Sequence, residues 1–204
     1  MIDLYPEFIC STTEVNKCPS DGRIEYAFIG RSNVGKSSLI NAIVNKKIAK
    51  TSSLPGKTRL MNYFLINNEF YFVDLPGLGY AQRSKDEIRK WQRMIREYIL
   101  NRKTLVTLFM LIDIRIPIQK IDLDFMLWLG INKIPFVIIF TKIDKLSKNE
   151  LGRNLFEYKK ELEKYWSQLP NIITTSSKNK NGIEEIKAYI KKTNEEIKNI
   201  IKNN

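Results

Sequence analysis

Residues 30–38 read GRSNVGKSS and match the pattern G-x-x-x-x-G-K-[ST]. They follow the short apolar run Ile24–Ile29, which predicts a strand, and lead into Ser37–Val44, where apolar residues recur at helical spacing. A glycine-rich turn between a strand and a helix lets successive backbone N–H groups point at phosphate oxygens, and the helix N-terminus adds partial positive charge. The stretch therefore predicts a phosphate-binding loop, and this context disfavours the alternative, a glycine-rich turn that arose by chance.

The same stretch predicts how the phosphates of a nucleotide are held. Lys36 is expected to bridge the terminal phosphates, and the hydroxyl of Ser37 is expected to bind Mg²⁺. The residues of this loop that we expect to contact the nucleotide are Gly30, Arg31, Ser32, Asn33, Val34, Gly35, Lys36, Ser37 and Ser38.

The rest of the chain alternates strand-like and helix-like segments, which is typical of an α/β fold with a mostly parallel sheet. The apolar runs Leu105–Ile112 and Phe136–Phe140 predict central strands that are covered on both faces, and Met61–Ile66 with Phe70–Val73 predicts an antiparallel hairpin. The other expected elements are helices over 84–100, 122–130 and Leu155–Trp166, a strand over Asn171–Thr175, and a last helix from Ile183. We expect three layers, with a mostly parallel six-stranded sheet flanked by helices.

One domain accounts for most of the 204 residues, since no linker divides them. We expect an N-terminal extension over residues 1–21, a single domain over 22–197 and a polar, basic tail over 198–204. The tail is rich in Lys and Asn and is expected to fray.

The composition excludes several classes of protein. Lys and Arg number 34 against 22 Asp and Glu, which gives a formal net charge of +12, and there is no histidine. The chain therefore has no Ser-His-Asp triad, no Cys-His pair and no histidine zinc ligand. Cys10 and Cys18 form no C-x-x-C pair and are expected to be free thiols. We find neither a signal peptide nor a membrane-spanning run, and so expect a cytoplasmic protein that binds no membrane.

A second motif, Asp74-Leu75-Pro76-Gly77, ends the hairpin. A carboxylate there can hold Mg²⁺ through water, and the N–H of Gly77 can bind a terminal phosphate, which would link the nucleotide to the following segment. In the loop before the hairpin, Thr58 offers another hydroxyl to Mg²⁺, in competition with Thr51, Ser52 and Ser53. The nucleotide contacts expected in these two segments are Gly56, Lys57, Thr58, Arg59, Leu60, Asp74, Leu75, Pro76 and Gly77.

A third motif, Thr141-Lys142-Ile143-Asp144, follows the strand Phe136–Phe140. A carboxylate here can accept hydrogen bonds from the N1–H and 2-amino groups of guanine, which adenine lacks. Taken alone, Asp144 is typical of a helix N-cap, but its place as the third motif in order favours guanine recognition. The Lys142 stem would cover the base plane, and backbone N–H groups after the last strand would lie near guanine O6. The base contacts that we expect are Thr141, Lys142, Ile143, Asp144, Thr175, Ser176 and Ser177.

Together these motifs resemble the EngB (YihA or YsxC) family of bacterial ribosome-assembly GTPases, within the translation-factor-related, Ras-like P-loop GTPases. The resemblance spans roughly residues 22–190 and is carried by GRSNVGKSS at 30–38, PGKTR at 55–59, DLPGLGYA at 74–81, DIR at 113–115 and TKID at 141–144. It implies Mg²⁺-dependent binding and hydrolysis of GTP, with GDP as product, a role in maturing the large ribosomal subunit, and a need for the protein in cell division and septation. On this resemblance Ser37 and Thr58 are the Mg²⁺ ligands, and with Asp74 they make up the metal-site residues that we expect.

Two residues bear on hydrolysis. Many GTPases carry a water-orienting Gln where this chain has Leu78, so we expect slow intrinsic hydrolysis and a missing group that comes from the ribosome or another segment. In related GTPases an Asn at the position of Asn33 can bind K⁺ beside the phosphates, whereas the alternative is that Asn33 only shapes the loop. Family members often carry an aromatic residue at the position of Leu78 and His at the position of Ile116. These departures bear only on the partner contacts that we expect. The residues expected to act in catalysis are Asn33, Lys36, Thr58 and Gly77.

Basic residues gather between 83 and 103, directly after the second motif. A basic helix coupled to the terminal phosphate would bind RNA in one nucleotide state and release it in the other, whereas the alternative is a solvated face with pairs such as Asp86–Lys90. We expect ribosomal RNA of the large subunit as partner, no DNA, and a monomer. Two other functions are open: a GTP-gated interaction protein of the division machinery, and a P-loop metabolite kinase, which would not need Thr141–Asp144.

Overall fold

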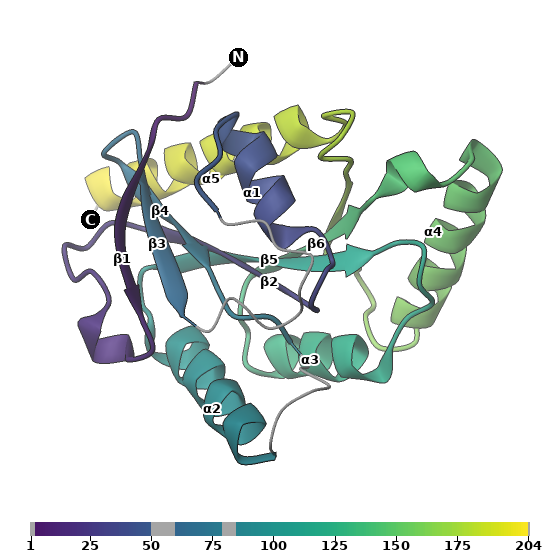
Figure 1. The fold of residues 1–204 in the computed structure, drawn as a ribbon, viewed down its shortest axis with the longest axis horizontal. Helices are drawn as coiled ribbons and strands as arrows, with labels where there is room; N and C mark the ends of the chain where they lie inside the picture. The colour runs from purple at the N-terminus through teal and green to yellow at the C-terminus, as the bar shows by residue number, and fades with distance from the viewer. Residues whose placement is uncertain (1–2, 50–59, 79–84, 204) are drawn as a thin grey trace.

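The computed structural model describes residues 3–49, 60–78 and 85–203, and its strands form one sheet in the order β1-β3-β4-β2-β5-β6-β7 (Figure 1). The strands are β1 (Pro6–Thr12), β2 (Glu25–Gly30), β3 (Met61–Ile66), β4 (Phe70–Asp74), β5 (Leu105–Asp113), β6 (Phe136–Thr141) and β7 (Asn171–Thr174). The pairs β1–β3 and β3–β4 are antiparallel, and every other neighbouring pair is parallel. The expected mostly parallel sheet is therefore confirmed.

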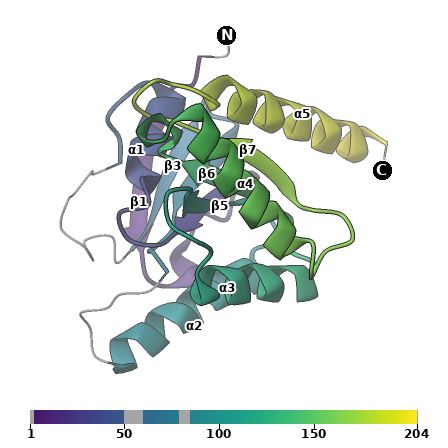
Figure 2. The same cartoon turned by 90° about the vertical axis from the view of Figure 1, so that its right-hand side faces the viewer.

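Helices cover both faces of this sheet (Figures 1 and 2). They are α1 (Lys36–Val44), α2 (Lys85–Asn101), α3 (Lys120–Ile131), α4 (Lys148–Leu162) and α5 (Ile183–Lys202), with short 3-10 turns at Val15–Lys17 and Ile143–Lys145. Side chains of α1 and α5 share one hydrophobic cluster with the sheet, and those of α2, α3 and α4 share the other. The molecule thus has the three layers that the sequence predicts.

Strand β5 shows why a continuous apolar run forms a central strand. Leu108, Met110 and Ile112 belong to the cluster with α2 and α3, whereas Phe109 and Leu111 belong to the cluster with α1 and α5. Successive side chains of a strand point to opposite faces, so a strand between two helical layers has to be apolar throughout.

The expectation of six strands is wrong, because the described residues form seven. The additional strand is β1, which lies inside the segment 1–21 that we expected to be an extension. β1 is an edge strand with a bulge between Phe8 and Cys10, and of its residues only Thr12 is buried. Backbone pairing to β3 holds this strand in place. Because its side chains are mostly exposed, they show no alternation of apolar and polar residues that would predict a strand.

Helix α4 begins at Lys148 and ends at Leu162, whereas the sequence predicted Leu155–Trp166. Its start is fixed by a capping box in which Ser147 Oγ accepts from the N–H of Glu150 at 3.3 Å and Glu150 Oε2 accepts from the N–H of Ser147 at 2.8 Å. Helix α5 also continues through Lys202, into the tail that was expected to fray.

Cys10 and Cys18 are free thiols, as expected. Burial raises the pKa of both, which makes them weak nucleophiles. Among the described residues, no helix combines the length and the apolar character that crossing a membrane requires.

The carboxyl ends of the parallel strands meet at one edge of the sheet. Gly30, Asp74, Asp113, Thr141 and Thr174 are the last residues of β2, β4, β5, β6 and β7. Ligands of open α/β sheets bind at this edge, and all three motifs found in the sequence lie there.

Candidate nucleotide-binding site

The phosphate loop joins β2 to α1, and two of its glycines are required by geometry. Gly35 caps α1 with a φ of 103°, in the left-handed region that favours glycine. A Cβ on Gly30 would lie 2.6 Å from the carbonyl oxygen of Leu111 on β5. Between them the N–H of Val34 donates to the carbonyl of Arg31 at 3.2 Å, which closes a tight turn. The predicted strand-turn-helix context is therefore present.

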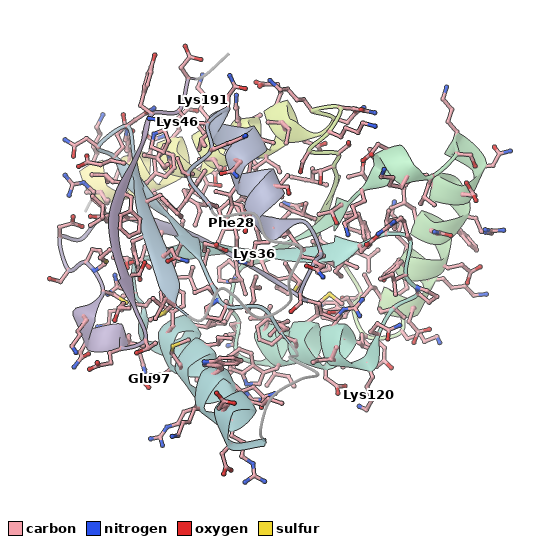
Figure 3. All side chains as sticks on the ribbon, in the orientation of Figure 1. Phe28, Lys36, Lys46, Glu97, Lys120 and Lys191 are labelled. Carbon is pink, nitrogen blue, oxygen red and sulfur yellow. The ribbon has the colours of Figure 1, made fainter. Side chains whose placement is uncertain are left out.

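Lys36 and Asp74 form a buried ion pair where the first and second motifs meet. Lys36 Nζ contacts Asp74 Oδ1, and the two side chains are only 9% and 3% exposed. Figure 3 marks Lys36 at the base of α1, while Asp74 ends β4. Each charge is the counter-ion of the other, which is what allows both to be buried.

The segment after β4 runs against the phosphate loop. The N–H of Leu75 donates to the carbonyl of Phe28 at 3.0 Å, and the N–H of Leu78 donates to the carbonyl of Gly30 at 2.9 Å. Gly77 is buried between them. The side chain of Leu78 is also buried and packs in the cluster shared with α2 and α3, so it points into the core.

A pocket of about 620 Å³ leads from the phosphate loop to the end of β6. Its lining includes Gly35, Asn41, Thr141, Lys142, Asp144 and Ser177. This volume lies in the range of small-molecule sites, about 300–1,000 Å³. The pocket thus brings the first and third motifs to one cavity.

Asp144 lies half-buried in the 3-10 turn Ile143–Lys145. Ser176 Oγ donates to Asp144 Oδ1 at 2.7 Å, and the N–H of Asn179 donates to Ser176 Oγ at 3.1 Å. Asp144 does not cap α4, because the N-cap is Ser147. The alternative that Asp144 is a helix cap is therefore wrong, and Asp144 lines the pocket instead.

Lys142 connects the third motif to the phosphate loop. Lys142 Nζ donates to the carbonyl of Asn33 at 2.6 Å, and the neighbouring Thr141 Oγ1 donates to the carbonyl of Val34 at 2.6 Å. A Cβ on Gly35 would lie 3.8 Å from Lys142 Cε, so the lysine stem runs along the pocket. That this stem covers a base stays a prediction.

Asp113, at the end of β5, is a site residue to which the sequence reasoning gave no role. It accepts hydrogen bonds from Arg115 Nε at 2.9 Å and Nη2 at 2.7 Å, and its Oδ2 lies 2.9 Å from Lys142 Nζ. Burial alone raises the pKa of Asp113, but the bonds from Arg115 and Lys142 outweigh it and lower the pKa to about 2. Asp113 therefore stays charged and holds Lys142 in place. In the sequence, the DIR stretch at residues 113–115 was the signal that could have indicated Asp113.

Arg31 and Asp122 form a second pair that the sequence did not indicate. Arg31 Nε lies 3.0 Å from Asp122 Oδ2, on α3, and Asp122 is 1% exposed. Within the described residues neither carboxylate oxygen of Asp122 has an aligned hydrogen-bond donor. Burial raises the pKa of Asp122, and the charge of Arg31 opposes that rise. The side chain of Arg31 thus ties the phosphate loop to α3.

Several expected site residues lie outside the described part of the chain. They are Gly56, Lys57, Thr58 and Arg59, together with the competing hydroxyl residues Thr51, Ser52 and Ser53. The choice of Thr58 as a metal ligand therefore stays a prediction. Leu60 is described, directly precedes β3 and is 38% exposed.

The donors at the site fit Mg²⁺ carried with a nucleotide. Ser37 stands in the first turn of α1, and Asp74 lies against its neighbour Lys36. Mg²⁺ prefers hard oxygen donors and is usually held by one or two protein groups plus phosphates. No group of three or more acidic, Cys or His side chains in the described ranges would hold a metal without that help.

A phosphate loop on this edge of a mostly parallel sheet, with the other two motifs beside it, is the arrangement of a P-loop GTPase. Residues 25–142 match the family model described as 50S ribosome-binding GTPase. A protein of Phocaeicola vulgatus, called probable GTP-binding protein EngB, is 54% identical over 196 residues, which covers 96% of this chain and 98% of that protein. The chain belongs to the EngB family of GTP-binding proteins. It binds GTP and GDP and hydrolyses GTP.

Two solved structures share the fold. One is Era in complex with MgGDPNP and nucleotides of 16S ribosomal RNA, at a TM-score of 0.67 and 22% identity over 83% of this chain and 56% of that chain. The other is a probable GTP-binding protein engB, at a TM-score of 0.60 and 24% identity over 84% of this chain and 99% of that chain.

Proposed function

We propose that this GTPase is a Mg²⁺-dependent switch that acts in the cytoplasm in assembly of the large ribosomal subunit, and that normal cell division and septation need it. The description of the matching family, 50S ribosome-binding GTPase, supports this partner. The complex of Era with ribosomal RNA adds a protein of the same fold that binds RNA. The resemblance to the EngB family carries the link to division.

In the proposed site, backbone N–H groups of the phosphate loop bind the phosphates, and Lys36 neutralises the terminal ones. Ser37, Asp74 and Thr58 would hold Mg²⁺, which supplies positive charge that stabilises the transferring phosphoryl group. Asp144, oriented by Ser176, accepts the N–H donors of guanine. Such a site works through placed charge and needs no histidine base, in agreement with a chain that has none.

The position of α2 carries the proposal. The N–H of Leu78 is bonded to the phosphate loop at Gly30, and α2 begins soon afterwards at Lys85. Its exposed cations are Arg89, Lys90, Arg93 and Arg96. A change at Gly77 on loss of the terminal phosphate would therefore be passed to a helix that carries positive charge.

The other end of α2 is fixed in the core. Glu25 is fully buried and accepts hydrogen bonds from Tyr98 Oη at 2.6 Å, Arg102 Nε at 3.0 Å and Thr104 Oγ1 at 2.8 Å. A buried charge with this many partners resists movement. We therefore expect any movement of α2 to occur at the end that follows the second motif.

Co-sedimentation with purified 50S subunits tests the proposal. We expect the full chain to pellet with 50S subunits when it holds a non-hydrolysable GTP analogue and to stay in the supernatant when it holds GDP. Raising the salt concentration should release it, because contacts between cations and phosphates weaken as counter-ions compete. Equal pelleting in both nucleotide states, or none in either, would contradict the proposal.

A charge reversal with a matched control locates the contact. Arg93→Glu on α2 should weaken the pelleting, whereas Lys191→Glu on α5, on the opposite face (Figure 3), should not. If 50S binding is absent while GTP still controls binding to division proteins, the alternative of a GTP-gated interaction protein is favoured.

A further inference from the structure

We propose that the groove between α2 and α3 binds one unpaired base of an RNA strand, which stacks on the aromatic side chains of the groove while arginines of α2 hold the phosphate beside it. The proposal rests on the function proposed above, because it requires that RNA reaches α2. It adds a site for a base, which the positive charge of α2 does not by itself provide.

The groove is a hollow of about 450 Å³ with walls from both helices. Its apolar lining is Ile88, Trp91 and Ile95 of α2 and Ile121, Phe125 and Trp128 of α3. The three aromatic side chains are half-buried, so part of each ring faces the hollow. Gly77 and Leu78 also line it, and the groove therefore reaches the segment that contacts the phosphate loop.

The aromatic residues of α3 offer a stacking surface. The rings of Phe125 and Trp128 are stacked, with centroids 5.7 Å apart and planes 26° apart. The guanidinium of Arg96 lies over the Trp128 ring, with Cζ 5.4 Å from the centroid. Proteins hold single unpaired bases on aromatic rings and on arginine planes, and the groove presents both.

A second hollow, of about 540 Å³, lies along the exposed face of α2. Its lining is Arg89, Gln92, Arg93, Arg96, Glu97 and Asn101. Gln92 and Arg96 line both hollows, so the two adjoin. A nucleotide with its base in the groove would therefore have its phosphate beside three arginines.

Carboxylates near the groove leave this positive charge in excess. Lys120 Nζ contacts the two carboxylate oxygens of Asp124 at 2.9 and 2.8 Å, which neutralises that side chain. Among the described residues that line the second hollow, Glu97 is the one carboxylate, against three arginines. Figure 3 marks Lys120 on α3 and Glu97 on α2. Arg89 also lies 3.8 Å from Asp86, in an exposed pair that solvent screens. The remaining charge favours an anionic strand over an apolar peptide, which would offer the arginines no further counter-charge.

The test uses the full chain loaded with a non-hydrolysable GTP analogue and two probes, a short oligoadenylate RNA and an abasic ribose-phosphate strand of the same length. Trp91 and Trp128 line the groove, while Trp166 packs on Phe136 with centroids 6.3 Å apart. Stacked adenine should therefore quench part of the tryptophan fluorescence. We expect oligoadenylate to bind roughly 5- to 150-fold more tightly than the abasic strand, the range found for loss of one stacked base.

Substitutions in the groove test whether the tighter binding of oligoadenylate arises there. Trp128→Leu should lower the affinity for oligoadenylate to that of the abasic strand and leave the abasic affinity unchanged. Phe125→Leu should reduce the difference in the same direction. The matched control is Phe156→Leu, which changes an aromatic residue 62% exposed on α4 and should have no effect. Thermal unfolding and GDP affinity monitor the fold of each variant.

The outcomes separate this inference from the proposed function. Equal affinity for the two probes without quenching, or binding of neither, overturns the base site, while GTP-dependent pelleting with 50S subunits leaves the proposed function standing. If Trp128→Leu abolishes that pelleting although the two probes bind alike, the groove holds a ribosomal protein and the base site is also overturned. Tight, quenching binding of oligoadenylate without 50S pelleting contradicts the proposed function alone.

Discussion

Asp144 lies at the end of the pocket, with one carboxylate oxygen held by Ser176. Asp144→Ala is expected to weaken GDP binding about 100-fold or more, because the guanine N–H donors lose their acceptor. Ser176→Ala should weaken it only about 5-fold, since it removes one orienting hydrogen bond of about 1 kcal/mol. Equilibrium binding of a fluorescent GDP measures both, and unchanged affinity in Asp144→Ala would show that the base lies elsewhere.

Asn33 has a φ of 61°, so Asn33→Gly keeps the loop conformation while it removes the side-chain amide. If Asn33 binds K⁺ beside the phosphates, wild-type hydrolysis should be faster in KCl than in NaCl, and Asn33→Gly should give equal rates in the two salts. Single-turnover GTP hydrolysis measures this. Equal wild-type rates in the two salts would leave Asn33 with a role in loop shape only.

Arg31→Ala removes the counter-ion of Asp122 and leaves a buried carboxylate. The free energy of unfolding should fall by about 2 kcal/mol at pH 7, below the roughly 3–5 kcal/mol of a fully buried broken pair, because Arg31 is 25% exposed. Burial raises the pKa of Asp122 and Arg31 opposes that rise, so the pKa in the folded variant should be higher still. The folded variant then takes up a proton at a higher pH than the wild type does, and the loss should shrink as the pH falls towards 4.

Urea unfolding of this variant at several pH values measures the effect. The double variant Arg31→Ala, Asp122→Asn removes the charge and should recover most of the lost stability. A loss that is the same at pH 4 and pH 7, or no recovery in the double variant, would show that the charge of Asp122 is not what the loss of Arg31 exposes.

The sequence indicates those candidate site residues whose signal is local spacing. Lys36 and Asp144 belong to short motifs with fixed neighbours. In the structure Asp144 lines the pocket, and Lys36 follows the lining residue Gly35 and pairs with Asp74. The pairs Arg31–Asp122 and Asp113–Lys142 join residues from different elements, so no spacing within one segment indicates them.

At the scale of elements, the sequence predicted those strands and helices whose pattern of apolar residues is strong. β5 and β6 lie between helical layers and are apolar throughout, so the sequence indicates them clearly. β1 has a mostly exposed surface, and the first turns of α4 are polar, so neither carries apolar periodicity. The start of α4 was nevertheless available in the sequence as the capping box of Ser147 and Glu150.

Ser147→Ala removes the cap of α4 and should lower the free energy of unfolding by about 1 kcal/mol. Asn149→Ala, an exposed change in the same turn, is the matched control and should have little effect. Urea unfolding without nucleotide gives the comparison, so that binding at the nearby Asp144 does not contribute. If both variants are as stable as the wild type, the capping box does not set the stability of α4.

At the scale of the whole molecule, the nucleotide site and the basic face of α2 are joined through one short segment. Leu78 is bonded to the phosphate loop and also lines the α2–α3 groove. Because its side chain is buried and has no hydrogen-bonding group, the isolated protein lacks a water-orienting residue at this position. We therefore expect the ribosomal partner to supply the missing water-orienting group, and to bind according to the nucleotide that the site holds.

Single-turnover GTP hydrolysis, measured with and without purified 50S subunits, tests this account most directly. We expect slow hydrolysis by the protein alone, a marked acceleration with 50S subunits at low salt, and no acceleration with 30S subunits. Arg93→Glu should lose the acceleration and keep the slow basal rate. Fast hydrolysis by the protein alone that 50S subunits do not change would contradict the account.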